Sequence, residues 1–496
     1  MTTIRRFARL VPTLLVPFAV FAAAPAARAG VTPATLNQLT TDVAEGRCET
    51  ALDTLNKLSA DDPKNVELIV LEANCELQLG RSGSKTFDPV AYERVSVARG
   101  SRSTSAAAQS AFFRQAYRFD DARLRRALDL FRKAAELQPK RADLFVGNVA
   151  ALANSGHVAD AAALLTSKGA AFGEDVQDDA TRLVADLVSQ GLHADALALA
   201  RAVQKAWPNT AAARRTMGQA LLANHETAAG VKEMEALLPL DPANLALGRQ
   251  LGTLLMMQRR FADAVPVFAK FVGEADDVLF MFALAQFRTA PQSSVAQFKA
   301  LLGRLKQKNV KETDPMVRVI SHYISRATDG RAPSSVMHLR AAKQFTDAGL
   351  TAAAVVELDE ALVREPDSAE LWVKLAEVYR RNDLFQFALD ALDHALHAVK
   401  PGADGAVYSA AEIEGQRGAV LYGLTRDADA ARALAAARAG KYPQPYDEVL
   451  VALALGRRDD AVKLFEEAAA AGGETADWAK AKLAQLQTAA GSPSKP

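Results

Sequence analysis

Residues 372–395 read WVKLAEVYRRNDLFQFALDALDHA, two short apolar patterns separated by a polar stretch at 380–383. In each pattern the apolar residues recur at spacings of three and four, which places them on one face of a helix. The first pattern consists of Trp372, Leu375, Ala376 and Tyr379, and the second of Phe385, Ala388, Leu392 and Ala395. The stretch therefore predicts two short antiparallel helices whose apolar faces meet.

The same arrangement returns with a period of 34 residues. Residues of one type stand 34 positions apart: Pro208 and Pro242, Gly218 and Gly252, Ala342 and Ala376, Ala354 and Ala388, and Ala361 and Ala395. The Pro and Gly pairs carry more weight, because Ala is frequent throughout the chain. A fixed period of this length indicates a stack of helix pairs, each of which buries its apolar face against its neighbours.

These residues resemble the motif of the tetratricopeptide-repeat family, which is W-x-x-L-G-x-x-Y in a first helix, then A-x-x-x-F and a closing Pro. The best copy is the stretch quoted above, with Pro401 beyond it. Two more copies are Ala341, Ala342, Phe345, Gly349, Ala354, Leu358, Ala361 and Pro366, and Met217, Gly218, Leu221, Gly230, Met234 and Pro242. The resemblance covers most of residues 32–490 and is poor at 277–332. It implies an all-α, right-handed superhelical solenoid of antiparallel helix pairs that binds other proteins.

The repeats and their interruptions divide the chain into five parts. We expect a signal peptide at 1–29, a first repeat array at 30–290 with an insertion at 81–120, and an irregular joint at 291–332 with a helix-like run at 316–326. A second array with a capping helix around Trp478, Leu483 and Leu486 follows at 333–490. The tail 491–496 has too little apolar content to become ordered.

The N-terminus has the features of a secretory signal. Arg5, Arg6 and Arg9 precede an apolar run at 10–24, and the sequence Ala27-Arg28-Ala29 follows. The run is too short for a membrane helix, which needs about 20 residues. We therefore expect cleavage after Ala29 and a periplasmic protein that has no membrane span once the signal is removed.

The charges of the chain nearly cancel, with 59 Lys and Arg against 58 Asp and Glu. A chain of this balance has no overall field to attract nucleic acid, so we expect no nucleic-acid partner. Hydrophobic residues make up 50% of the chain and many of them are alanine, whereas aromatic residues make up 6%. This composition favours closely packed helices.

The expected insertion at 81–120 is rich in basic residues, which few acids oppose. They are Arg81, Lys85, Arg94, Arg99, Arg102, Arg114 and Arg118. One interpretation is a solvated loop or an extra helical excursion, because insertions in repeat arrays often form loops. The other is a docking element for an acidic partner or an anionic polymer.

Cys48 and Cys75 are the two cysteines of the chain. They lie 14 and 13 residues from the turn near Asp62, so on two antiparallel helices they reach nearly the same height. An even number of cysteines in an exported protein also favours a disulfide. The alternative is two separate buried thiols.

No motif of an enzyme or of a cofactor site stands out. The seven histidines are His157, His193, His225, His322, His338, His394 and His397. They form no H-E-x-x-H pattern, and there is no phosphate-binding loop or G-x-S-x-G sequence. His394 and His397 share a helix face, which permits a metal pair, but a solvated face is the simpler interpretation. We expect no enzyme, no cofactor and no metal.

The resemblance implies a concave face lined by the first helices, where residues one repeat apart form columns. Arg215 and Arg249 form one column, and Leu222 and Met256 form another. The predicted groove consists of Arg215, Gln219, Arg249, Leu222, Met256 and Met257. Guanidinium groups beside a flexible apolar patch suit a peptide with an acidic group. The alternative is solvated arginines beside methionines of the core.

Two functions are consistent with these features. The first is a periplasmic scaffold or adaptor that binds proteins in cell-envelope assembly, secretion or export. The second is an accessory of exopolysaccharide export that binds the polysaccharide itself. A groove that binds polysaccharide would be lined by aromatic side chains. The chain has only three tryptophans, Trp207, Trp372 and Trp478, which argues against such a groove.

Overall fold

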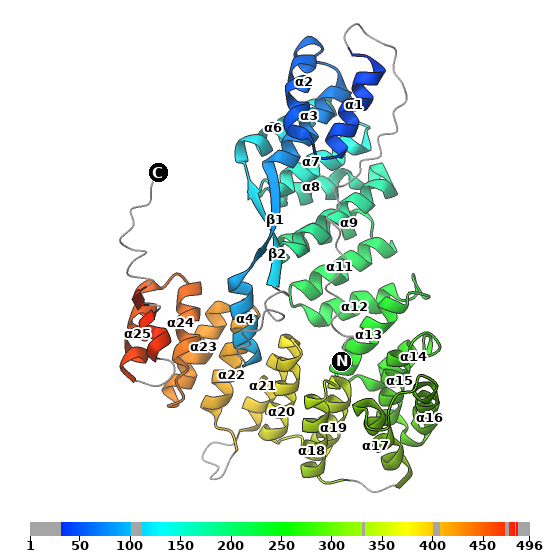
Figure 1. Ribbon diagram of the computed structural model, residues 1–496, viewed down its shortest axis with the longest axis vertical. Coiled ribbons are helices and arrows are strands. Elements are labelled where there is room, and N and C mark those ends of the chain that lie inside the picture. The colour runs from blue at the N-terminus through cyan, green and yellow to red at the C-terminus, as the bar shows by residue number, and fades with distance from the viewer. Residues whose placement is uncertain are drawn as a thin grey trace. The chain divides into compact units, whose positions relative to one another are not determined.

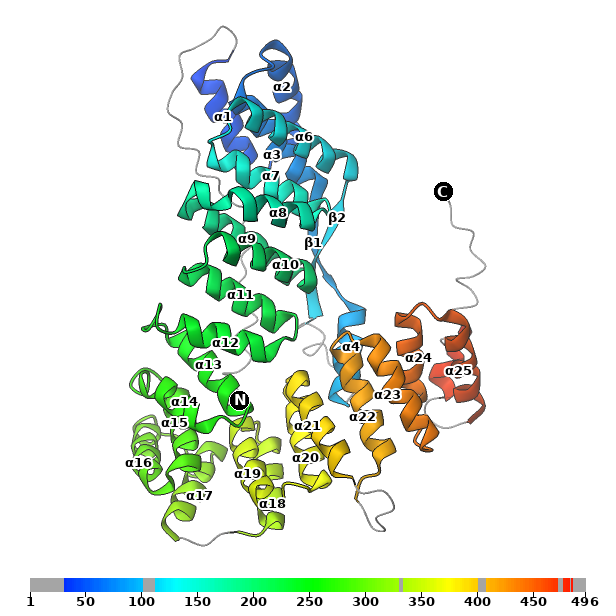
Figure 2. The same cartoon turned by 180° about the vertical axis from the view of Figure 1, so that it is seen from behind.

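The computed structural model describes residues 31–100, 112–329, 333–399, 407–471, 476–481 and 483–484. It divides into two compact units, of which the first comprises residues 1–88 and 110–243 and the second 89–109 and 244–496. Within each unit, helices follow one another along the chain and pack as antiparallel pairs (Figures 1 and 2). The predicted all-α fold of stacked helix pairs is confirmed.

In the first unit the pairs are α1–α2, α3–α6, α7–α8, α9–α10 and α11–α12. The elements are α1 (Pro33–Ala44), α2 (Cys48–Asp61), α3 (Val66–Gly80), β1 (Arg81–Phe87), β2 (Phe113–Phe119), α6 (Asp121–Leu137), α7 (Ala142–Asn154), α8 (Val158–Lys168), the 3-10 helix η3 (Gly169–Phe172), α9 (Glu174–Ser189), α10 (His193–Ala206), α11 (Ala211–Ala223) and α12 (Thr227–Leu237).

In the second unit the pairs are α13–α14, α15–α16, α18–α19, α20–α21, α22–α23 and α24–α25, while α17 packs on α16. The elements are α4 (Pro89–Arg99), α13 (Leu245–Met257), α14 (Phe261–Ala269), α15 (Asp276–Thr289), α16 (Pro291–Gln307), α17 (Pro315–Asp329), α18 (Ser335–Asp347), α19 (Thr351–Arg364), α20 (Ala369–Arg381), α21 (Phe385–Ala398), α22 (Ala410–Gly423), α23 (Asp427–Ala439), α24 (Pro445–Ala454) and α25 (Arg458–Ala471).

The first helix of a pair commonly ends at a residue with left-handed backbone conformation. Such residues include Gly191, His225, Arg259, Gly349 and Asp383, with φ between 61° and 79°. The next amide then bonds back to the helix, as Leu384 N does to the carbonyl of Tyr379 at 3.0 Å. The 34-residue spacing of 191, 225 and 259, and of 349 and 383, thus reflects one turn geometry repeated along the chain.

Small residues stand where two helices of a pair approach most closely. A Cβ atom added to Gly252 would lie 2.4 Å from the ring of Phe268, so α13 and α14 fit together only with glycine there. A Cβ atom added to Gly218 would lie 3.6 Å from the side chain of Met234, which is an ordinary van der Waals distance. Ala342 and Ala376 are buried. The glycines and alanines that are spaced by 34 therefore belong to the helix interfaces, whereas Pro208 and Pro242 are exposed.

The insertion lies between the two helices of one pair, α3 and α6. Strands β1 and β2 pair antiparallel from Arg81 opposite Phe119 to Phe87 opposite Phe113. At the base of this ribbon, Asp120 N donates to the carbonyl of Gly80 at 2.8 Å, so the helix pair stays closed although the chain leaves it. The pattern of the sequence did not predict the two strands.

The segment 291–332 contains two helices, and the second covers the helix-like run expected at 316–326. Helices α16 and α17 occupy most of the segment, and Pro291 stands at the start of α16, where a missing amide hydrogen costs nothing.

Near the C-terminus, residues 476–481 are helical, and Trp478 contacts the rings of Tyr446 and Phe465. The signal peptide, the tail, Arg102, Pro401 and Leu486 lie outside the described residues.

The predicted disulfide is confirmed. Cys48 and Cys75 are bonded, with their Cα atoms 5.0 Å apart, and join α2 to α3. Both are fully buried in a cluster with Leu55, Leu68 and Leu71. Among the described helices, none has both the length and the apolar character that a membrane crossing requires.

Candidate binding surface

Part of the predicted groove lies in the first unit, on α11. Arg215 and Gln219 are exposed there, while Leu222 is half-buried. Arg215 Nη2 lies 2.6 Å from Asp241 Oδ2, so its guanidinium already has a carboxylate partner. An exposed ion pair of this kind contributes little to stability, about 0–1 kcal/mol, and a guest carboxylate could compete for it.

The rest of the predicted groove lies in the second unit, on α13, and corrects the prediction. Met256 and Met257 are 0% and 3% exposed, and the Met257 carbonyl accepts a hydrogen bond from Tyr379 at 2.6 Å. Both methionines belong to the core because α13 also packs against α15 and α19. Arg249 is paired with Asp277 at 3.2 Å. These residues therefore form no open apolar patch.

A different surface holds a helix that is not its neighbour in the chain. Helix α4 of the insertion packs on α22 and on the end of α20, the first helices of two consecutive pairs, and both views show it beside α22 (Figures 1 and 2). We call this the α4-binding surface and define it by Arg380, Asp383, Tyr422, Gly423, Asp427 and Tyr446.

Arg94 makes the most extensive of these contacts. Its two terminal nitrogens lie 2.6 and 2.9 Å from the two carboxylate oxygens of Asp427, and the first also donates to the Tyr422 carbonyl at 2.7 Å. The guanidinium stands over the Tyr422 ring at 4.3 Å. The two side chains of the ion pair are mostly buried. A two-pronged contact of this kind requires arginine, since lysine lacks the planar fork.

The C-terminal end of α4 is held by three further contacts. Arg99 Nε donates to Asp383 Oδ1 at 2.5 Å, and Arg380 Nε donates to the Ala98 carbonyl at 2.6 Å, which satisfies a helix-end acceptor. Ala98 itself is fully buried against Gly423. A Cβ atom on Gly423 would lie 2.4 Å from that of Ala98, so this approach requires the glycine.

Arg94 and Arg99 stand out in the sequence as basic residues of the insertion, but their acidic partners do not. One signal was present. The turn that ends α18 has Gly349 at its left-handed position, whereas the equivalent turn 34 residues later has Asp383. A side chain costs about 1 kcal/mol in that conformation, so an aspartate there indicates a separate role. The long separation in sequence, 284 residues for Arg99 and Asp383, hid the partner.

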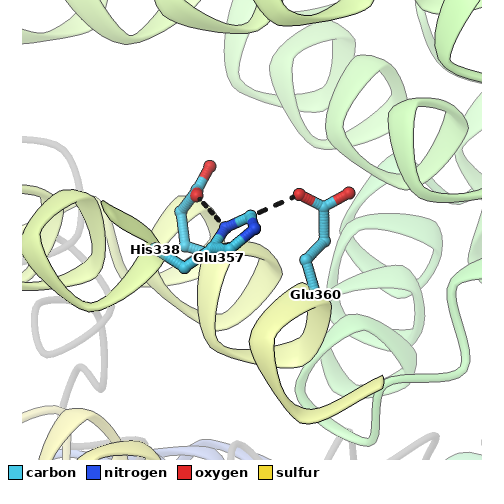
Figure 3. Close-up of side chains that lie close together, drawn as sticks. All are labelled: His338, Glu357 and Glu360. Carbon is cyan, nitrogen blue, oxygen red and sulfur yellow. Dashed lines mark hydrogen bonds and ion pairs between the residues drawn. The ribbon is translucent and has the colours of Figure 1, made fainter. Parts of the chain in front are cut away.

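A second polar cluster lies inside the second unit, around α19. His338 Nδ1 lies 2.8 Å from Glu357 Oε2 and 3.8 Å from Glu360 Oε2 (Figure 3). One ligand atom from each residue falls within 4.8 Å of the others, a spacing that a metal ion could bridge. However, Arg326 pairs with both carboxylates, at 2.7 Å in the case of Glu357. Arg288 also lies 3.6 Å from Glu360, so the two carboxylates face two guanidinium groups, and we interpret the cluster as an internal ion-pair network.

The cluster keeps Glu357 ionised despite its burial. The side chain is 1% exposed, and burial raises its pKa. Hydrogen bonds from His322 and His338 and the charge of Arg326 outweigh that effect and lower the pKa to about 2. Glu357 therefore links α17, α18 and α19 as an anion at neutral pH.

Asp359 joins more distant helices in the same way. Arg259 Nε, in the turn between α13 and α14, lies 2.5 Å from Asp359 Oδ1, and Arg288 of α15 contacts Oδ2 at 2.5 Å. The Arg259 guanidinium also stacks over Trp372 at 4.8 Å. These partly buried contacts join α13 and α15 to α19 and α20.

The predicted histidine pair has separate partners. His394 stacks on Trp372 with ring centroids 4.4 Å apart, and His397 Nδ1 lies 2.6 Å from the Asp393 carbonyl oxygen. These contacts give both side chains structural roles.

The polar cluster around α19 was not predicted, although the sequence carries a signal for it. That signal is the acidic run Glu357, Asp359 and Glu360 on a helix whose other residues are largely buried and apolar.

No protein-family model matches the sequence, and no curated protein matches it. Among solved structures, the chain is similar to a tetratricopeptide repeat protein from Parabacteroides merdae, with 12% identity, coverage of 63% of this chain and 98% of that one, and a TM-score of 0.24. It is also similar to yeast Tom70, with 12% identity, coverage of 92% and 96%, and a TM-score of 0.27. These superpositions are loose.

The architecture follows from the chain's own features. Glycines and alanines spaced by 34 lie in the helix interfaces, and residues with positive φ at the same spacing end the first helices. These helix pairs stack one after another along each unit. The chain therefore has the fold of a tetratricopeptide-repeat protein.

Proposed function

We propose that this chain is a non-enzymatic scaffold of the periplasm that binds segments of partner proteins during cell-envelope assembly or secretion. One observation carries the proposal. The repeats hold α4, a helix from far away in the sequence, through paired guanidinium groups, a capped helix end and a close Ala–Gly contact. A surface that binds one helix by side-chain chemistry provides what a protein-binding repeat needs.

Two features support export. The basic and apolar pattern of residues 5–24, followed by Ala27-Arg28-Ala29, is typical of a cleaved signal. The Cys48–Cys75 disulfide is of a kind that persists in oxidising compartments. N-terminal sequencing of the chain from a periplasmic fraction tests this point. We expect the mature chain to begin at Gly30, and a chain that keeps Met1 in the cytoplasm would contradict export.

Photo-crosslinking tests the scaffold function itself. A photoreactive residue at Gln219, exposed on the first helix α11, should give adducts with a small set of defined envelope proteins. The matched control carries the same group at Lys232, which is exposed on the second helix α12. Adducts only from the Lys232 position, or from neither, would contradict binding along the first helices.

A further inference from the structure

The contacts between α4 and its surface have a definite pattern. Arg94 and Ala98 stand at positions i and i+4, on one face of the helix, and Arg99 follows at i+5, where its side chain reaches Asp383. Asp427 and Asp383 each receive a guanidinium, and Gly423 receives the Ala98 methyl group. A helix is therefore recognised by two arginines and a small residue between them.

The surface has the chemistry to select such a helix from others. Without α4, the carboxylates of Asp383 and Asp427 would lose the guanidinium partners that the structure gives them. Arg380 would keep its contact with Gln416 and could cap another helix end. Ala98 lies so close to Gly423 that there is no room for a Cβ atom at position 423. A residue larger than alanine at position i+4 of the guest helix would therefore collide with α22.

The insertion supplies α4 to this surface in an unusual way. The helix belongs to the second unit, whereas the strands on either side of it, β1 and β2, belong to the first. Because α4 and its surface belong to one chain, the binding of α4 is intramolecular. An outside helix must therefore displace a competitor that is covalently attached.

We propose that the α4-binding surface is a recognition site for basic helices with arginine at i and i+5 and a small residue at i+4. In the free chain α4 occupies this site, and a partner helix of the same chemistry replaces it. This inference rests on the proposed scaffold function and names the partner's chemistry. Occupation by α4 means that a weakly binding helix does not engage the surface.

A peptide of residues 88–100, DPVAYERVSVARG, is the probe. Its binding is measured by fluorescence polarisation with the full chain in three forms. The first is the natural chain, the second carries Arg94→Ala and Arg99→Ala to vacate the surface, and the third adds Gly423→Ala to the second. Circular dichroism verifies that all three forms keep their helices.

We expect the peptide to bind the vacated chain at least about tenfold more tightly than the natural chain, in which α4 competes. Adding Gly423→Ala should weaken that binding by a further factor of about ten or more, as should replacing both peptide arginines by lysine. Absence of binding to the vacated chain at peptide concentrations up to about 1 mM would overturn the proposal. Equal binding to the second and third forms would overturn it as well.

The two proposals fail separately. Crosslinking from Gln219 does not involve the α4-binding surface, so defined partners there together with a failed peptide titration would leave the scaffold function and remove this recognition site. Peptide binding to the vacated chain without crosslinked partners would keep the recognition site and contradict the scaffold function.

Discussion

At the scale of single residues, Asp383 shows how a repeat position acquires a second role. Its φ of 61° is one that glycine adopts freely, as Gly349 does in the equivalent turn. The strained aspartate is explained by its carboxylate, which accepts two hydrogen bonds from Arg99. Local geometry alone would favour glycine at this position.

Asp383→Gly should therefore change global stability by less than about 1 kcal/mol, because relief of the left-handed strain offsets the loss of a partly exposed ion pair. Amide hydrogen exchange in α4 should nevertheless become faster. Arg259→Gly is the matched control, since Arg259 has the same φ of 61° but pairs with Asp359. Equal acceleration of α4 exchange in both variants would contradict the role assigned to Asp383.

Glu357 makes stability depend on acid pH. Its pKa is about 2 in the folded chain against an ordinary value of 4.5, so its stabilising contribution is complete above pH 4.5 and is lost as pH falls from 4.5 towards 2. The contribution is on the order of 3 kcal/mol. Urea unfolding at pH 7 and pH 3 should show a smaller pH effect in Glu357→Gln than in the natural chain. An identical pH effect in both would contradict this account.

At the scale of elements, the close approach of α4 and α22 can be tested by size. Gly423→Ala places a methyl group against Ala98 and should displace α4, which proteolysis within residues 89–99 would reveal. Adding Ala98→Gly removes the opposing methyl and should restore much of the protection. Gly303→Ala in α16 is the control, because a Cβ there meets nothing within 4 Å and should stabilise the helix by about 0.5–1 kcal/mol. Cleavage of α4 that does not change with Gly423→Ala would refute the packing.

The elements also show what the sequence could and could not predict. The helix pairs could be predicted from the local periodicity of apolar residues. The disulfide could be predicted because its two cysteines lie on adjacent helices within one short stretch of sequence. The α4 contacts do not, because Arg94 and Asp427 are 333 residues apart and no period connects them. Helix α16 was not predicted because it departs from the 34-residue motif, whereas α17 covers the helix-like run expected at 316–326.

At the scale of the whole molecule, a repeat array is stabilised mainly by contacts between neighbouring pairs. The end pair α1–α2 has a neighbour on one side among the described helices, and the disulfide to α3 compensates by constraining the unfolded chain. Replacing both Cys48 and Cys75 by alanine should destabilise this end by about 2–4 kcal/mol. Hydrogen exchange should accelerate in residues 33–61 and stay unchanged in 351–398. Uniform acceleration throughout the chain would contradict local stabilisation.

The central claim is that the repeats bind α4 as a guest through specific side-chain contacts. The most direct measurement is the coupling free energy between Arg94 and Asp427, obtained from a double-mutant cycle of Arg94→Ala and Asp427→Ala. Hydrogen-exchange protection of residues 89–99 provides the readout. We predict a favourable coupling of about 1–3 kcal/mol. Strictly additive effects of the two substitutions, with no coupling, would contradict the account.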